Sequence, residues 1–505
     1  MTSSNQALRP EAAANITLAT KARQVEAWLG ALALDEPLGN AGRLADYLET
    51  HDRAGIAAAF RKQLLDILAD AIRQTLNALD TEFRDMPLPM DEHQLGHVDQ
   101  ALRLLAAVAD FNRRLIRDSA DRSPPLFGEN PLPGHLSRFL HAEREIMGLC
   151  HLSHRQLPER FWLGTHEAGL TLIESGLAGK PDPAHPAATL RDIYLTLLLE
   201  ATADPYHLSE PERIWTVDII ARYGALVVLE PVQRAHRGGV FGIRADQDKP
   251  PYPLAWQSGV VPDCDLVLNT APLVRKLALI VSHLERGRAL PQGVPAIRHP
   301  GYKDLLQRLK LTWGGATHRF TPRYQPAQPS LRVAIVGFHP IYRRLSDSAG
   351  LTGDSDLGRC WLVNESPGGM ALEVAKPTFR LKIGSLVSVS REPGDSRHDL
   401  GLVHWFKMAG DGALTFGLKY LRGHIRPSFW ALPGGELASP CLLIQTGKRN
   451  SRVVQSIIMP AQGVDPRADL QVVQEGERLN IKLDGKIKAL PEVDVFSCEP
   501  SGDEV

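Results

Sequence analysis

Apolar residues recur at helical spacing through the first half of the chain. In the segment "AAAFRKQLLDILADAIRQTLNALD", apolar side chains three and four positions apart would form one stripe along a helix. The stripe consists of Phe60, Leu64, Ile67, Leu68, Ala71, Ile72, Thr75, Leu76 and Leu79. The segment "DQALRLLAAVADFNRRLIRD" repeats this arrangement, and proline- and glycine-rich breaks separate further segments of the same kind. We therefore predict a flexible lead over residues 1–20 and a mainly α-helical region over 21–315, with a few short strands near its end.

The pattern changes to short β-rich runs from Leu331 onward. Runs such as "LRVAIVGF", "IGSLVSVSRE" and "LGLVHWF" are divided by turn residues, and Asp411-Gly412 is a typical hairpin turn. This predicts a small antiparallel barrel or sandwich over residues 331–426. An arginine- and proline-containing linker over 316–330 precedes it. Residues 427–505 are also β-rich, either as an extension of the barrel or as a second small β domain.

Composition narrows the classes of function. The chain has 505 residues, 43% of them hydrophobic, and a net charge of −1, so it is a globular, multidomain protein without the overall positive charge of nucleic-acid coats. Its five cysteines are scattered and form no Cys-x-x-Cys pair, which is typical of reduced thiols. The start lacks the layout of a signal peptide, and no apolar run reaches the roughly 18 residues that a membrane span needs. We expect a cytoplasmic protein that binds no nucleic acid.

Evidence for enzyme chemistry is weak. His135, His141, His151 and His154 gather in one segment, but no His-Glu-x-x-His pattern accompanies them. The sequence contains neither a phosphate-binding loop of the Walker type nor a Gly-x-Ser-x-Gly elbow. We predict a protein that is not an enzyme and holds no metal or cofactor. The alternative of a metal-dependent enzyme using the His135–His154 region stays open.

A local concentration of basic residues stands where the helical pattern ends. Between His299 and Leu345, Asp304 is the only acidic residue. The basic residues are Lys303, Arg308, Lys310, Arg319, Arg323, Arg332, Arg343 and Arg344. Arg319 and Arg323 are four positions apart in "HRFTPRYQP", where prolines keep the segment from forming a helix. Such a cluster is either a solvated face or an anion site.

A second polar motif follows on the barrel. The run "NESPGG" places Asn364, Ser366 and Gly369 in an Asn-x-Ser-x-x-Gly arrangement at the end of a β run. Asparagine and serine supply short hydrogen-bonding groups, and glycine lets the backbone approach a ligand closely. Taken alone, the motif is an ordinary turn.

Together the two motifs resemble the PilZ domain, the bacterial receptor module for cyclic di-GMP. That family carries Arg-x-x-x-Arg before a six-stranded barrel and Asp/Asn-x-Ser-x-x-Gly on the barrel. Here "RFTPR" and "NESPGG" match these motifs, and the resemblance covers residues 317–424, about a fifth of the chain. It departs from the family at His318, where many members have another arginine. It also departs in the loop-like insertion "YRRLSDSAGLTGDSDLG" between the motifs.

The resemblance implies a ligand and a set of residues that bind it. Arg319 and Arg323 would contact the phosphates and guanines of cyclic di-GMP, with His318 as a further candidate. Asn364 and Ser366 would hydrogen-bond a base edge or a phosphate, and Gly369 would shape the turn.

The implied protein is a second-messenger receptor. Ligand binding would order the arginine segment and signal through the helical region to an unidentified protein partner. The alternative is a degenerate PilZ-like scaffold that mediates protein contacts without a ligand.

Overall fold

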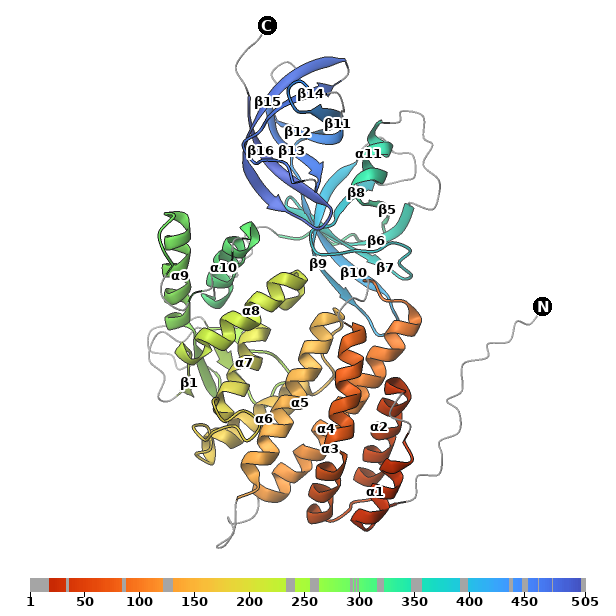
Figure 1. Ribbon diagram of the computed structural model, residues 1–505, viewed down its shortest axis with the longest axis vertical. Coiled ribbons are helices and arrows are strands. Elements are labelled where there is room, and N and C mark those ends of the chain that lie inside the picture. Colours follow the sequence, from red (N-terminus) through yellow and green to blue (C-terminus); the bar gives the residue numbers. More distant parts are fainter. Residues whose placement is uncertain are drawn as a thin grey trace, which may run out of the picture.

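The computed structural model describes most of the chain. The described residues are 18–32, 36–83, 88–120, 130–232, 241–254, 263–290, 294, 297, 299–315, 322–346, 357–390, 398–435, 439–446, 453–461, 463–474 and 476–500. They form a helical region followed by two β-barrels, and the second barrel lies at the end of the molecule away from α1 to α6 (Figure 1). The predicted fold class, a multidomain α + β protein, is confirmed.

The helical region contains long helices and one small sheet. Its helices are α1 (Ala22–Gly30), α2 (Pro37–Arg53), α3 (Ala58–Phe83), α4 (Glu92–Ala120), α5 (Leu132–Leu152), α6 (Phe161–Glu174), α7 (Leu190–Thr202), η1 (Pro205–His207), α8 (Glu210–Tyr223), η2 (Gly224–Leu226), α9 (Ala271–Glu285) and α10 (Pro300–Trp313). The strands β1 (Val228–Pro231), β2 (Phe241–Ile243), β3 (Tyr252–Pro253) and β4 (Leu266–Asn269) pair in the order β1-β4-β2-β3. The apolar stripe predicted for α3 faces the core, where Leu64, Leu68 and Leu79 are completely buried.

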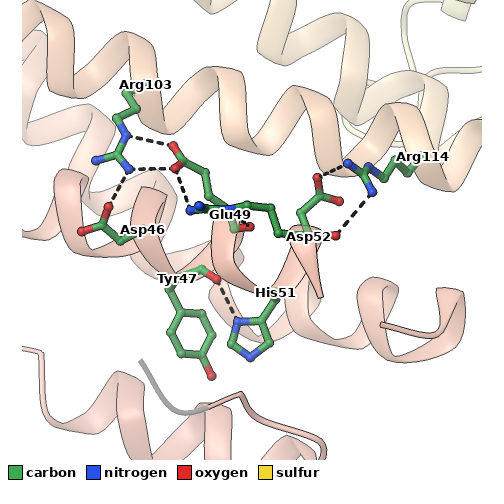
Figure 2. A network of polar contacts seen from close by, with 8 residues as sticks. Asp46, Tyr47, Glu49, His51, Asp52, Arg103 and Arg114 are labelled. Atoms are coloured by element: carbon green, nitrogen blue, oxygen red, sulfur yellow. Dashed lines mark hydrogen bonds and ion pairs between the residues drawn. The ribbon is translucent and has the colours of Figure 1, made fainter. Parts of the chain in front are cut away.

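Ion pairs join α2 to α4 across the helical region (Figure 2). Arg103 of α4 donates from Nε and Nη2 to the two carboxylate oxygens of Glu49, at 2.8 Å each, and also reaches Asp46. One turn further along α2, Asp52 accepts from Arg114 at 2.8 Å. Two-pronged arginine–carboxylate pairs are directional, so they fix the register of the two helices.

The first barrel follows the helical region. Its strands are β5 (Leu331–Val336), β6 (Leu357–Ser366), β7 (Gly369–Val374), β8 (Leu386–Ser390), β9 (Asp399–Met408) and β10 (Leu414–Tyr420). They close in the order β10-β7-β6-β5-β8-β9, with all neighbours antiparallel. The turn between β9 and β10 contains Asp411 and Gly412, and Gly412 takes the positive φ of 84° that favours glycine.

The last part of the chain forms a second closed barrel. Its strands are β11 (His424–Ala431), β12 (Ser439–Thr446), β13 (Val453–Pro460), β14 (Asp469–Gln474), β15 (Glu477–Ala489) and β16 (Val493–Pro500). They close in the order β11-β12-β13-β16-β15-β14. In both barrels the first strand pairs with the second and fourth, and the third pairs with the sixth. The two barrels therefore share one topology, which the sequence did not reveal.

The first barrel is packed directly on the helical region. One apolar core contains side chains from α2 to α4 as well as the interior residues Leu372, Val403 and Phe406 of the barrel. Polar contacts continue the junction, because the amide of Met408 donates to the carbonyl oxygen of His154 at 2.8 Å. The barrel and the helices thus share buried surface, so a displacement of one must expose apolar surface or move the other.

A helix lies between the two barrels. Residues Phe338–Ser346 form α11, so part of the segment that looked like a loop insertion is helical. Phe338 and Ile341 of α11 are buried in an apolar cluster with residues from the outer faces of both barrels, among them Leu402 and Leu442. This burial explains the helix, because an amphipathic segment becomes ordered where its apolar side finds a partner.

Among the helices that the structure describes, none is both long enough and apolar enough to cross a bilayer.

Candidate functional site

The structure describes part of the predicted ligand site. Asn364, Ser366 and Gly369 lie at the β6–β7 hairpin, and Arg323 lies in the segment before β5. The other two predicted residues, His318 and Arg319, lie outside the described residues. The four described positions therefore carry the geometry of the candidate site.

A short backbone bridge brings the two motifs together. Tyr324, which follows Arg323, pairs antiparallel with Glu365, the residue between Asn364 and Ser366. The amide of Tyr324 donates to the carbonyl oxygen of Glu365 at 2.7 Å, and the reverse bond measures 2.8 Å. This register places Arg323 opposite Ser366, and residues opposite each other on paired strands point to the same side. The arginine and the serine thus belong to one face.

That face is the outside of the barrel. Along β6, Leu362 pairs with the core residue Leu372, and a register shift follows between Leu362 and Asn364. Such a bulge re-aims the side chains beyond it. After the bulge, Glu365 pairs with the core residue Met370, which places its neighbours Asn364 and Ser366 on the opposite, outer side. Both motif side chains are half-buried.

The two turn glycines of "NESPGG" have different surroundings. A Cβ atom at Gly369 would lie 1.9 Å from the carbonyl oxygen of Leu418 in β10, whereas a Cβ at Gly368 would meet no atom closer than 4.0 Å. Gly369 is therefore required by the close approach of β7 to β10. The hydroxyl of Ser366 also donates to the carbonyl oxygen of Gly369 at 3.2 Å, which closes the turn.

Two hydrogen bonds from Tyr420 hold the motif hairpin from behind, and the sequence did not predict them; we call this pair of bonds the polar lock. The hydroxyl of Tyr420 at the end of β10 donates to Oε1 of Glu365 at 2.8 Å. Burial and the Glu365 carboxylate raise the pKa of Tyr420, so the phenol keeps its proton and remains a donor. The amide of Tyr420 also donates to the carbonyl oxygen of Gly368 at 3.0 Å. These bonds fix the hairpin that carries Asn364 and Ser366.

An exposed tryptophan shares the outer face of β6. Trp361 pairs with Leu331 of β5 and Glu373 of β7, and 46% of its surface is accessible. A large aromatic ring that is half exposed beside polar motif residues is available for stacking. The alternation of β6 places it on the same side as Asn364. The tryptophan in "CWLVNES" was the signal in the sequence, but strand pairing was needed to assign its face.

The basic cluster seen in the sequence does not form one surface. Lys303 and Arg308 belong to α10, where Arg308 pairs with Glu212 of α8. Arg332 lies at the start of β5 and donates to the hydroxyl of Ser330 at 2.5 Å. Arg323, by contrast, is exposed and makes no ion pair with any residue that the structure describes. Among the described residues of this cluster, Arg323 is thus the one brought to the second motif.

The histidines of the alternative metal site have separate structural partners. His141 contacts Asp182 at 2.9 Å, and His154 donates from Nδ1 to the carbonyl oxygen of Phe406 at 3.1 Å. The rings of His151 and Tyr206 meet edge to face. Within the described part of the chain, no three histidine, cysteine, aspartate or glutamate side chains are placed to hold a metal ion.

Two surface clefts lie away from the motifs. One of about 730 Å³ is beside the small sheet and is lined by Arg244, Lys249 and Tyr252. Another of about 380 Å³ lies between α10 and β15, with Lys303 and Lys486 in its wall. The motif residues instead form an open outer face, where a ligand would be held by polar groups and stacking rather than by enclosure.

The comparisons with known proteins concern the helical region. Residues 23–234 match a family model described as the N-terminal domain of the cyclic-di-GMP receptor FimW. The matched residues include α1 to α8 and end just after β1, so both barrels lie outside the match. The match covers less than half of the chain, and it falls on a different part from the segment that resembles PilZ. No curated protein and no solved structure matches the chain.

Proposed function

We propose that this protein is a cytoplasmic bacterial receptor for cyclic di-GMP that binds its ligand on the outer face of the first barrel, through a PilZ-like site. The observation that carries the proposal is the Tyr324–Glu365 bridge, which brings Arg323 of the first motif opposite Ser366 of the second. Independent support for the class comes from the helical region, which is similar to the N-terminal domain of a cyclic-di-GMP receptor.

The chemistry of the ligand suits these side chains. Cyclic di-GMP presents two phosphates and two guanine edges. Arginine pairs with phosphate or with guanine O6 and N7 through two parallel hydrogen bonds, and we assign that role to Arg319 and Arg323. Asn364 and Ser366 hydrogen-bond a base edge or a phosphate. His318 adds a weaker contact, and Gly369 maintains the turn rather than touching the ligand.

Binding of this kind needs no bond-making step. We propose a receptor without catalytic activity, cofactor or nucleic-acid partner. Ligand binding orders the arginine segment against β6, and the change passes to a protein partner through the helical region, which shares buried surface with the barrel. The five cysteines are free thiols, which suits a reducing compartment.

Calorimetric titration of the full chain with cyclic di-GMP tests the proposal. The proposal predicts saturable binding that depends on both Arg319 and Arg323. Absence of heat with protein at micromolar concentration would favour the rival interpretation, a scaffold whose barrels only mediate protein contacts. The second barrel supports this rival interpretation, because it has the topology of the first barrel but no Asn-x-Ser-x-x-Gly motif. Metal analysis of the purified protein tests the enzyme alternative.

A further inference from the structure

A third arginine lies at the β6–β7 turn, and it comes from the segment between the two barrels. Nη2 of Arg422 donates to the carbonyl oxygen of Pro367 at 3.3 Å. Pro367 and Gly368 are the two turn residues that separate Ser366 from Gly369. Arg422 is therefore in direct contact with the second motif, although 55 positions separate it from Pro367 in the sequence.

The guanidinium of Arg422 has unused donors. The side chain is exposed, and its bond to Pro367 occupies one of five N–H groups. Among the described residues it pairs with no carboxylate, unlike Arg103, Arg117 or Arg222, each of which is held by an acidic side chain. An exposed arginine without an acidic neighbour is a surface that can receive an anion.

The backbone at Arg422 is fixed from both barrels. On one side, the amide of Leu421 donates to the carbonyl oxygen of Leu400 in the first barrel at 2.8 Å. On the other side, Gly423 has a φ of 137°, and a Cβ there would lie 2.6 Å from Cγ2 of Ile444 in the second barrel. Both neighbours of Arg422 are thus packed against a barrel, and an arginine whose backbone is held in this way loses little backbone freedom when it binds.

Arg422 stands at the start of the second barrel, but that barrel lacks the motifs of a ligand site. Arg422 and Arg426 are spaced like Arg319 and Arg323, and they stand at the start of the second barrel. Arg426, however, lies within β11 opposite Leu443, so the pair does not form an open segment before a strand. The stretch "QTGKRNSRVV" between β12 and β13 also lacks an Asn-x-Ser-x-x-Gly motif. The partner that Arg422 contacts is the motif turn of the first barrel.

We propose that Arg422 is a further ligand-binding residue of the first barrel, where it contacts a phosphate of the cyclic dinucleotide beside the motif turn. This inference rests on the proposed function. It means that the site is completed by the junction of the two barrels, so that bound nucleotide contacts the linker before the first barrel and the segment before the second.

Calorimetric titration of the full chain with cyclic di-GMP tests this role. We expect Arg422→Ala to weaken binding by about tenfold or more, because a charge-assisted bond to phosphate is lost. Arg422→Lys keeps the charge without the planar fork and should fall between Arg422→Ala and the unsubstituted chain. Arg359→Ala is the matched control. Arg359 is also exposed and lies on β6, but toward the end of that strand away from the motif, and its removal should change affinity less than twofold.

The outcomes separate the two proposals. Suppose that the unsubstituted chain binds cyclic di-GMP and that Arg323→Ala abolishes binding. If Arg422→Ala and Arg422→Lys then both bind within twofold of the unsubstituted affinity, the proposal for Arg422 is wrong and the proposed function stands. If the unsubstituted chain gives no heat, the proposed function itself fails. Equal thermal unfolding midpoints of Arg422→Ala and the unsubstituted chain confirm that any loss of binding reflects the ligand contact.

Discussion

The imidazole of His154 lies flat on the phenyl ring of Phe406, with ring centroids 3.7 Å apart and planes inclined by 18°. His154 follows α5 in the helical region, and Phe406 is a core residue of β9 in the first barrel. The same histidine donates from Nδ1 to the carbonyl oxygen of Phe406 and accepts from the amide of Met408 through its own carbonyl. One residue thus joins the helices to the barrel by stacking and by two hydrogen bonds.

Acid should weaken this junction. Burial, reinforced by the nearby Arg213, lowers the pKa of both His151 and His154 to about 3. A histidine whose folded pKa is depressed contributes stability above its unfolded pKa of about 6.5, and that stability is lost as pH falls from 6.5 toward 3. Each histidine should remove up to about 1.4 kcal/mol of unfolding free energy per pH unit within that window.

Urea unfolding at pH 7.0, 6.0 and 5.5 measures this effect. His154→Phe keeps an aromatic ring on Phe406 and removes the titrating group, so the variant should lose less stability than the unsubstituted chain over that range. An identical pH dependence in the two proteins would show that His154 does not titrate in this window.

Glu143 should make the fold less stable as pH rises, which is the opposite of the effect of the two histidines. Glu143 is 2% exposed, Nη2 of Arg113 lies 3.8 Å from its Oε1 atom, and its Oε2 atom has no hydrogen-bond partner among the described residues. Burial, partly opposed by Arg113, raises the pKa of Glu143 to about 8. A carboxyl with a raised folded pKa stabilises the fold at low pH, and this contribution is lost as pH rises from about 4.5 through 8.

Glu143→Gln isolates that contribution. The neutral amide should remove the loss of stability at alkaline pH, so that the variant gains up to about 3 kcal/mol relative to the unsubstituted chain between pH 6 and pH 9. Chemical unfolding at the two pH values gives the difference. A constant difference between the proteins at both values would contradict the raised pKa.

The two glycines of the motif turn should differ sharply on substitution. Gly369→Ala forces a Cβ into the carbonyl oxygen of Leu418, so β7 and β10 must separate, and we expect a loss of about 2 kcal/mol or more of unfolding free energy. Gly368→Ala meets no close atom and should cost less than about 1 kcal/mol. Thermal and urea unfolding compare the pair. Equal stability of the two variants would mean that the strands approach less closely than described.

Tyr420→Phe tests the lock behind the motif. Removal of the hydroxyl leaves the Glu365 carboxylate without its 2.8 Å donor, and the bond to a charged acceptor is worth about 1.5–3 kcal/mol. If the lock positions Asn364 and Ser366, the variant should also bind cyclic di-GMP several-fold more weakly. Unfolding and titration of the same preparation separate the two effects. Unchanged affinity in a destabilised variant would limit Tyr420 to a structural role.

Local patterns predicted the elements better than their arrangement. The apolar stripe of α3 and the alternation of β5 to β10 follow from the residues themselves. Helix α11 was not expected, because the sequence analysis treated "YRRLSDSAGLTGDSDLG" as a loop-like insertion. In the structure, Pro340 falls in the first turn of α11, where it costs no helical hydrogen bond. Closure of the second barrel depends on pairs such as β11 with β14, which no local pattern encodes.

In the candidate site, too, the sequence predicted the local motifs but not the contacts between distant segments. The resemblance to the PilZ motifs singles out Asn364, Ser366 and Arg323, and the Tyr324–Glu365 bridge brings their segments together. The contacts of Tyr420 with Glu365 and of Arg422 with Pro367 each join residues 55 positions apart, so only the folded chain reveals them. The close packing of β7 on β10 is a further reason for glycine at position 369, and the sequence did not reveal it.

The central claim is that Arg323 and the Asn364–Gly369 motif form one site for cyclic di-GMP. Its most direct test is calorimetric titration of the full chain and of Arg319→Ala, Arg323→Ala and Arg359→Ala with that ligand. The account predicts saturable binding to the unsubstituted chain and to Arg359→Ala, with affinity roughly ten- to a hundredfold lower in each of the other two variants. Binding to Arg323→Ala with the affinity of the unsubstituted chain would contradict it.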